Sequence, residues 1–516
     1  MNTPHTVIRR GPRRLLEFAC VLLAWLPVLP VKLQAQFAFV TNNDAVTITG
    51  YTGSGGALKI PSTINGLTVT AIDDFAFAGL ASLTSVTIGT AVTYIGFAAF
   101  SGCTGLANFT VDTLNPAYRS LDGVLFNKNK DTLVAYPAGK GGDYVAPNGT
   151  TSIGAEAFFG CTALTSVTLP GSVTNIGEGA FEECTGLTSV PLGSGVASLG
   201  LRAFANCTAL TSVVIPLSVT NLVANYFKFD RFSGSFAGCT SLTNITVDPR
   251  NTTYSSLDGV MFNQSRDTLI TYPPGNGGDY IVPNSVTTIA GGAFGGCTRL
   301  TGVSVGSGVA CIGGSAFAGC TGLSSVAIPN SVTSIGYVAF LRCSGLTNIT
   351  IGNSVTNIAD QAFSRCTGLS SVTIPKSVTN IGSGVFEDCT GLRSVFFAGN
   401  APTQVDYWDP FLGASSLTVY YLAGNAAWGP TFAGRPAVLW NPVIQVGDAS
   451  FGVRSHGFGF NIVGTRNNPV VVEASSSLAE STWVPLQTLT LTNGLVAFAD
   501  SAWTNHPARF YRLRAP

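Results

Sequence analysis

The sequence predicts a mostly β protein, a solenoid of 23-residue units followed by a small β-sandwich. A phenylalanine recurs at an interval of 23 residues, which one 9-residue and two 35-residue insertions lengthen. A cysteine follows nearly every one of these phenylalanines three residues later, and a run with L-x-x-V-x-L spacing comes next. This period is typical of stacked repeats, because one unit has too few apolar residues to fold alone. The marker phenylalanines are Phe77, Phe100, Phe158, Phe181, Phe204, Phe236, Phe294, Phe317, Phe340, Phe363 and Phe386.

Residues 1–35 have the pattern of a secretory signal peptide. Several arginines precede an apolar run from Leu15 to Leu29 that Glu17 interrupts, and Ala35 is a small residue suited to cleavage. An uncleaved membrane anchor is the alternative, but this run is short for a bilayer span. Removing the segment takes five basic and one acidic side chains from 26 of each, which leaves 21 and 25. No other segment is apolar enough to span a membrane.

Each unit is expected to contribute two short strands and one helical turn to a rung. In the L-x-x-V-x-L run that starts at Leu164, alternation buries Val167 and Leu169 on one face of the first strand. Pro170 ends this strand, because proline has no N–H for a ladder. A second extended piece spans 172–176, and the Ala-Phe-x-x-Cys segment of the next unit is interpreted as one helical turn.

The periodic cysteines are expected to be buried thiols. An exported chain with 12 cysteines usually forms disulfides. One cysteine per rung, however, places parallel side chains about 5 Å apart, an orientation that does not suit a disulfide. Leu80 fills the same slot in the first unit, which supports an apolar role. Cys311 lies off this ladder as a candidate free thiol, and carboxylates beside the ladder, such as Glu182, are expected on a solvated face. The ladder cysteines are Cys103, Cys161, Cys184, Cys207, Cys239, Cys297, Cys320, Cys343, Cys366 and Cys389.

The segments around and within the repeats are expected to be caps and hairpins. Residues 36–76 are interpreted as an N-terminal cap, 77–394 as the repeats and 395–440 as a C-terminal cap. Caps cover the open strand edges at the ends of a solenoid. The two 35-residue inserts, near 109–143 and 245–279, are interpreted as β-hairpins.

Residues 441–516 lack the repeat and predict the small β-sandwich. The expected strands are Phe458–Val463, Val470–Ala474, Trp483–Leu491, Leu495–Ala499 and Phe510–Leu513. The stretches Val472–Ser475, Trp483–Leu486 and Arg509–Leu513 resemble a C-terminal module found on bacterial exported proteins.

The repeat unit resembles the BspA-type leucine-rich repeat. The likeness is carried by Ala157-Phe158-x-Gly160-Cys161-Thr162-x-Leu164 through Ile176-Gly177, and by the recurrence of the segment 118–133 as 254–269. It covers roughly residues 37–440. The resemblance implies a secreted or surface-exposed β-rich solenoid, often used in adhesion and protein–protein contact, without shared catalytic residues.

The sequence does not predict an enzyme, a cofactor or a metal site. Equal numbers of basic and acidic residues provide no basic face for nucleic acid, and three histidines are too few for a histidine-based centre. Ser304 lies in a G-x-S-x-G pattern but in the setting of an ordinary strand. Asn127, Asn129 and Asp131 alternate like calcium ligands, but the glycine and bidentate glutamate of a calcium loop are missing.

Two surface features are candidate partner-binding sites. Thr168, Thr350 and Thr373 point outward from equivalent strand positions, and a second outward row includes Thr174 and Thr356. Such rigid, uncharged rows dock a partner at a low entropy cost. The 9-residue insertion is rich in the aromatic and arginine side chains of binding hot spots. Its candidates are Tyr226, Phe227, Phe229, Arg231 and Phe232. The alternatives are a merely soluble β face and rings that pack back on the solenoid.

The expected function is therefore that of a secreted or cell-surface, non-catalytic protein that binds a protein or glycan. A structural spacer or assembly component without a dedicated ligand is the alternative. The sequence leaves open the ligand, the oligomeric state, surface retention, the role of the C-terminal segment and the redox state of Cys311.

Overall fold

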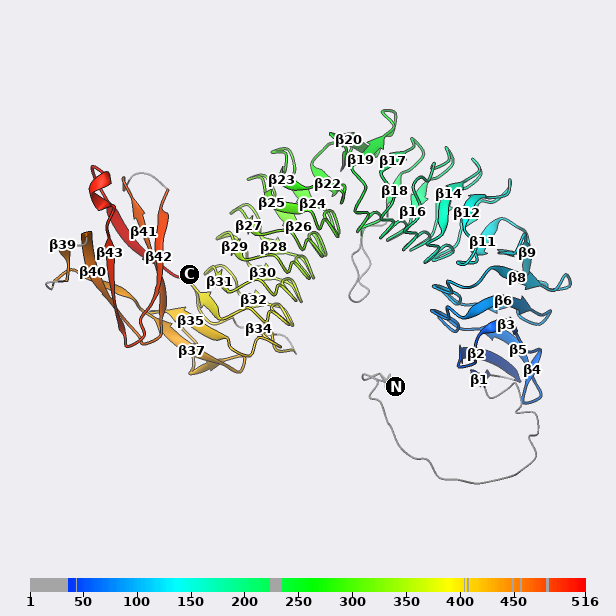
Figure 1. Cartoon of the computed structure of the whole chain (residues 1–516), viewed down its shortest axis with the longest axis horizontal. Coiled ribbons are helices and arrows are strands. Elements are labelled where there is room, and N and C mark those ends of the chain that lie inside the picture. Colours follow the sequence, from blue (N-terminus) through cyan, green and yellow to red (C-terminus); the bar gives the residue numbers. More distant parts are fainter. Residues whose placement is uncertain are drawn as a thin grey trace, which may run out of the picture.

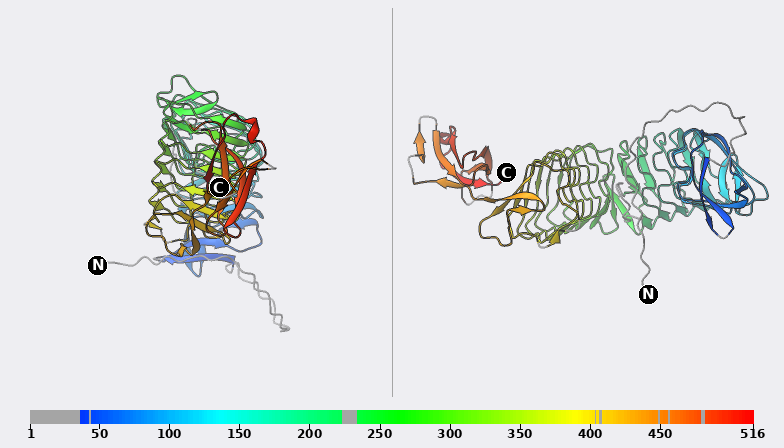
Figure 2. Two further views of the ribbon diagram at one scale, coloured as in Figure 1. Left: turned by 90° about the vertical axis from the view of Figure 1, so that its left-hand side faces the viewer. Right: turned by 90° about the horizontal axis from the view of Figure 1, so that it is seen from below.

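The chain forms an arc of stacked rungs with a β-rich module at its C-terminal end (Figures 1 and 2). This computed structural model describes residues 36–42, 44–222, 234–402, 404–405, 408–447, 450–454, 457–478 and 482–516. Within these ranges, regular structure is strand apart from one 3-10 turn, η2 (Trp503–Asn505). The predicted mostly β solenoid is confirmed.

Each rung contributes a longer and a shorter strand, and both pair in parallel with the next rung. The longer strands are β3 (Gly56–Lys59), β6 (Leu83–Ile88), β8 (Asn108–Val111), β12 (Gly142–Val145), β14 (Leu164–Thr168), β17 (Ser212–Ile215), β19 (Asn244–Val247), β23 (Gly278–Ile281), β25 (Leu300–Ser304), β27 (Ser325–Ala327), β29 (Asn348–Thr350), β31 (Ser371–Ile374), β33 (Ser394–Phe397), β35 (Thr418–Leu422) and β37 (Arg435–Trp440). The shorter strands are β7 (Tyr94–Ile95), β13 (Ser152–Ile153), β15 (Asn175–Ile176), β16 (Ser198–Leu199), β18 (Asn221–Leu222), β24 (Thr288–Ile289), β26 (Cys311–Ile312), β28 (Ser334–Ile335), β30 (Asn357–Ile358), β32 (Asn380–Ile381) and β34 (Gln404–Val405). In the rung between β14 and β17, Pro191 interrupts the longer strand, and an isolated bridge from Ser166 to Ser189 remains.

The predicted helical turn of each rung is wrong. The Ala-Phe-x-x-Cys segments are successions of tight turns, several of them with a residue at positive φ, such as Gly160 (φ 69°) and Glu183 (φ 61°). Alternate N–H groups bond between rungs, as when the Phe158 N–H donates to the Ala180 carbonyl oxygen at 2.7 Å, and those between them make i→i−3 turns, as when the Cys161 N–H donates to the Phe158 carbonyl oxygen at 3.1 Å. Backbone hydrogen bonds that run between rungs are unavailable for an i→i−4 helix.

The marker phenylalanines form ring stacks along the core. Neighbouring rings lie 4.7–6.0 Å apart between centroids, with planes within 17° of each other. Tyr136 and Tyr272, which lie near the ends of the two inserts, begin new stacks on Phe158 and Phe294. The last stack ends at Phe411, within the segment for which the sequence predicts a cap.

The two inserts divide the solenoid into three cores. Each is a three-stranded antiparallel unit that starts a new sheet of shorter strands. In β10, Leu125 belongs to the first core, whereas Val124 and Phe126 belong to the second. In β21, Met261 completes the second core, and its two neighbours enter the third. Both middle strands are therefore buried on both faces. The strands are β9 (Tyr118–Leu121), β10 (Val124–Asn127), β11 (Thr132–Ala135), β20 (Tyr254–Leu257), β21 (Val260–Asn263) and β22 (Thr268–Thr271).

Further strands cover the ends of the repeat array. At the N-terminal end, β1 pairs with β2 in an antiparallel ladder, and β2 pairs in parallel with β5, which continues to β7. The C-terminal module has two small sheets, in which β40 pairs with β38, β39 and β43, and β41 pairs with β42 and β44. These strands are β1 (Phe37–Asn42), β2 (Ala45–Tyr51), β4 (Thr63–Ile64), β5 (Leu67–Ile72), β36 (Thr431–Phe432), β38 (Val443–Gln445), β39 (Gly452–Arg454), β40 (Gly457–Val463), β41 (Pro469–Ser475), β42 (Val484–Thr490), β43 (Leu495–Asp500) and β44 (Phe510–Arg514).

Candidate functional site

Three outward threonines of the longer strands carry hydroxyls that the described chain does not use, whereas the Thr110 and Thr246 hydroxyls each accept from a neighbouring asparagine amide at 3.1 Å. Thr168, Thr350 and Thr373 are exposed on β14, β29 and β31, and no hydrogen bond to their hydroxyls occurs within the described parts of the chain. In the second row, the hydroxyls of Thr174 and Thr356 each donate to a carbonyl oxygen of the preceding rung at 3.3 Å. The second row thus reinforces the solenoid, and the hydroxyls of Thr168, Thr350 and Thr373 in the first row are open to a ligand.

Thr350 and Thr373 line a cleft of about 840 Å³ between the solenoid and the C-terminal module. The opposite wall is the segment from Arg512 to Pro516, which includes the end of β44. This volume lies within the range of ligand sites in proteins, about 300–1,000 Å³. Thr168 lies over the second core, away from the cleft. The cleft therefore joins two of the three predicted threonines to residues that the sequence did not single out.

Two arginines on β44 share one buried carboxylate. Glu473 of β41 is 4% exposed, and the Nε atoms of Arg512 and Arg514 donate to its two oxygens at 2.7 and 2.6 Å. Burial alone raises the pKa of this carboxyl, but hydrogen bonds and charge from the two guanidiniums leave it below its ordinary value. Both arginine side chains stay nearly half exposed, and the Arg512 guanidinium lies 4.5 Å from the centre of the Trp483 ring. The group holds one net positive charge in a fixed position.

Contacts at the end of the solenoid hold the two walls of the cleft in place. The Trp440 indole N–H donates to the Pro469 carbonyl oxygen at 2.8 Å, and the Asn468 amide donates to the Leu439 carbonyl oxygen at 3.1 Å. The Tyr420 hydroxyl donates to the Asn467 carbonyl oxygen at 3.3 Å. These bonds link the last rungs to the loop before β41, the strand against which β44 pairs.

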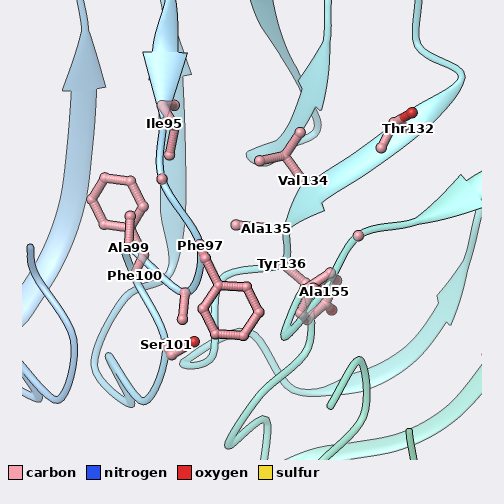
Figure 3. Close-up of a pocket in the computed structure, with 14 residues that line it drawn as sticks. Ile95, Phe97, Ala99, Phe100, Ser101, Thr132, Val134, Ala135, Tyr136 and Ala155 are labelled. Carbon is pink, nitrogen blue, oxygen red and sulfur yellow. The ribbon is translucent and has the colours of Figure 1, made fainter. Parts of the chain in front are cut away.

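A second, smaller cavity marks the boundary between the first and second cores (Figure 3). It has a volume of about 180 Å³ and lies between the segment 95–101 on one side and β11 with the segment 154–157 on the other. Phe100 and Tyr136, which end one ring stack and begin the next, both line it. The Ser101 hydroxyl donates to the Glu156 carboxylate at 2.6 Å across this boundary. Its lining is largely apolar and suggests no chemistry.

The predicted aromatic loop Tyr226–Phe232 lies outside the described residues, so its five candidates stay predictions. It follows β18, where the Leu222 N–H donates to the Tyr254 hydroxyl at 3.1 Å. The equivalent bond at the first boundary joins the Ile95 N–H to the Tyr118 hydroxyl at 2.9 Å. β18 therefore lies beside the second insert, at the boundary between the second and third cores.

The candidate metal ligands and the carboxylate beside the cysteine ladder have structural roles. The described chain holds no group of three His, Cys, Asp or Glu side chains placed to bind a metal. The Asp131 carboxylate accepts hydrogen bonds from Asn127 and Thr132 at 2.5 and 3.0 Å, which closes the loop on itself. The expected solvated position of Glu182 is wrong: it is buried, and the Arg202 Nε donates to it at 2.8 Å. In the sequence, Arg202 in the next rung is the signal that could have indicated this ion pair.

The ladder cysteines are buried free thiols, as predicted. Nine of the ten ladder thiols donate to a backbone carbonyl oxygen of the rung before them, as when the Cys343 Sγ donates to the Phe317 carbonyl oxygen at 3.1 Å. The same carbonyl oxygen also accepts from the Cys320 N–H at 3.2 Å, so the thiol adds a second donor to it. Burial raises the pKa of Cys320 and Cys366, and it raises that of Cys103 to about 11. Cys311 is a free and exposed thiol on β26.

Comparison with known proteins identifies the family of the repeats and several solved structures to which the chain is similar. The sequence profile described as "BspA type Leucine rich repeat region (6 copies)" matches residues 57–131, 142–233 and 278–398. A leucine-rich cell surface protein from Faecalibacterium prausnitzii is 24% identical, over 76% of this chain and 94% of that one, with a TM-score of 0.39. The pneumococcal vaccine antigen PcpA is 20% identical, over 75% and 92%, with a TM-score of 0.45. A leucine-rich repeat protein from Eubacterium ventriosum is 21% identical, over 73% and 90%, with a TM-score of 0.43.

Two negative findings accompany these comparisons. The search of curated proteins gave no match. In the part of the chain that the structure describes, no helix has the length and apolar character needed to cross a membrane.

Proposed function

Because the chain belongs to the BspA-type leucine-rich repeat family, we propose that it is an exported, non-catalytic protein that binds a protein partner on its outward threonine row. The observation that carries this proposal is the pair of free hydroxyls on Thr350 and Thr373 inside a cleft of ligand size. A rigid repeat array that presents unused hydrogen-bonding groups loses little entropy when a partner docks. The N-terminal segment 1–35 supports export, since its pattern is that of a signal peptide.

The aromatic loop Tyr226–Phe232 is proposed as a second contact for the same partner. Its composition supports the proposal, because aromatic and arginine side chains dominate the energy of protein interfaces. A spacer without a dedicated ligand is the competing function. The hydrogen-bonded second threonine row and the ring stacks favour it, because both stiffen the array without offering a binding group.

Capture of extracellular partners by the chain tests the proposed function. Thr350→Val with Thr373→Val removes both free hydroxyls and keeps the shape and β-branching. We expect at least a fivefold loss of capture. Thr356→Val, in the second row, is the matched control and is expected to retain capture. Replacing the loop aromatics by serine tests the second contact separately. Equal capture by all variants would favour the spacer.

A further inference from the structure

We propose that the cleft between β44 and the solenoid binds an extended acidic peptide segment of a protein partner, which adds as a strand to the free edge of β44. This inference rests on the protein-binding function proposed above and names the class of ligand. Backbone geometry, charge and the opposite wall each support it.

The free edge of β44 supplies the backbone groups. β44 pairs with β41 from Phe510 opposite Ser475 to Arg514 opposite Val471, and it ends the sheet order β42-β41-β44. In the described chain no other strand pairs with it. Alternate N–H and C=O groups of an edge strand point away from its neighbour. Since the segment from Arg512 to Pro516 lines the cleft, this edge offers a template for one more strand.

The charge of the cleft selects an acidic peptide. Its lining contains two arginines and no lysine, aspartate or glutamate side chain. Glu473 beneath them neutralises one of the two charges and is itself buried. The exposed guanidinium edges of Arg512 and Arg514 are therefore available to carboxylates, which they bind with charge-assisted hydrogen bonds.

The spacing of the arginines sets a pattern for the peptide. Residues i and i+2 of a strand point to the same face, about 7 Å apart. Arg512 and Arg514 are such a pair, so an adjacent strand matches them with carboxylates at alternate positions. On the other wall, the Thr350 and Thr373 hydroxyls and the Asn353 side chain are uncharged and add hydrogen-bonding groups without repelling the peptide.

The probe is a labelled acetyl-Thr-Glu-Thr-Glu-Thr-Glu-Thr-amide peptide, titrated with the full chain by fluorescence anisotropy. We expect saturable binding that weakens at higher salt. The same peptide with Gln in place of Glu is expected to bind at least tenfold more weakly, and the Lys version not to bind. A peptide N-methylated at every second amide keeps its charge but lacks the strand donors in one register. Two such peptides exist, methylated at the odd or at the even amides, and one of the two is expected to bind at least tenfold more weakly.

The arginines are tested by a charge-free version of their cluster. Arg512→Gln with Arg514→Gln and Glu473→Gln removes the guanidiniums without leaving a buried charge, and its thermal unfolding shows whether the module still folds. We expect at least tenfold weaker peptide binding. Arg250→Gln, an exposed arginine on the solenoid, is the matched control and is expected to bind normally. In a second variant, Thr350→Trp fills the cleft from the other wall and is expected to weaken binding even if the triple variant fails to fold.

Several results would overturn the inference. These are equal binding of the Glu and Gln peptides, no effect of N-methylation in either register, full binding by both cleft variants, or no binding of the acidic peptide at all. Displacement of the bound peptide by a neutral oligosaccharide would overturn the inference as well. If partner capture still depends on Thr350 and Thr373 in such a case, the ligand class fails and the proposed function stands.

Discussion

Replacing Phe340 with alanine tests whether the ring stack holds the rungs together. Phe340 is fully buried in the third core, and its ring stacks on Phe317 at 5.0 Å and on Phe363 at 5.1 Å. A buried Phe→Ala change costs about 3–5 kcal/mol, and each aromatic pair is worth about 0.5–1.5 kcal/mol beyond its buried area. With two stacking partners, the loss is expected near the upper end, about 4–5 kcal/mol. Phe411→Ala is expected to cost less, because its two ring partners lie farther away, Phe386 stacked at 6.0 Å and Phe432 edge-on at 6.3 Å.

The assay combines urea unfolding with hydrogen exchange measured by mass spectrometry. Since each rung contacts only its neighbours, faster exchange is expected in the rungs around residue 340 and not in the first core. A double-mutant cycle of Phe340→Ala with Phe317→Ala should show coupling of about 0.5–1.5 kcal/mol. The same cycle with the distant Phe181 should be additive. A loss below about 2 kcal/mol, or equal coupling in both cycles, would refute the role assigned to the stack.

Four further outcomes follow from the thiols and from buried polar groups. With residues 1–35 removed, a thiol reagent at neutral pH is expected to modify Cys311 rapidly and the ten ladder thiols only after denaturation. A second thiol that reacts rapidly would contradict the burial of the ladder cysteines. Because burial raises the pKa of Cys103 from 9.0 to about 11, its stabilising effect is complete below pH 9 and is lost as the pH rises towards 11, which alkaline unfolding curves measure. The pKa of Glu473 is lowered instead, so its contribution is present above pH 4.5 and lost as the pH falls; Glu473→Gln should flatten the acid side of the module's thermal unfolding profile. Asn115→Ala leaves two carbonyls and two N–H groups without partners, so it is expected to lower the free energy of unfolding in urea by about 3 kcal/mol or more. Asn251→Ala is expected to cost the same, and Asn353→Ala, at an exposed position, is expected to cost less.

The sequence predicted the solenoid because its signals repeat in every rung. The spacing of Leu164 and Val167, for example, fixes which side chains enter the core, and both are fully buried. The helical turn was wrong for a physical reason: apolar spacing does not reveal whether an N–H bonds along the chain or to the next rung. A residue such as Glu183, at φ 61° within that segment, shows the departure from a helix only in three dimensions.

The candidate site was harder to predict, because it joins segments far apart in the sequence. Exposure of Thr350 and Thr373 follows from strand alternation, and the structure agrees. That Arg512 lies in the same cleft depends on how the C-terminal module packs against the last rungs. Single bonds such as that from Trp440 to Pro469 set this packing, and no periodic pattern announces them.

The two strands that are buried on both faces, β10 and β21, also indicate how such a chain can gain or lose repeats. β10 and β21 begin 136 residues apart, and the same distance separates Asn115 from Asn251. The second core is thus one sealed compartment that matches one unit of duplication. Insertion or removal of such a compartment would leave the adjoining interiors filled, so the arc can be lengthened or shortened in whole blocks without new packing at the joints.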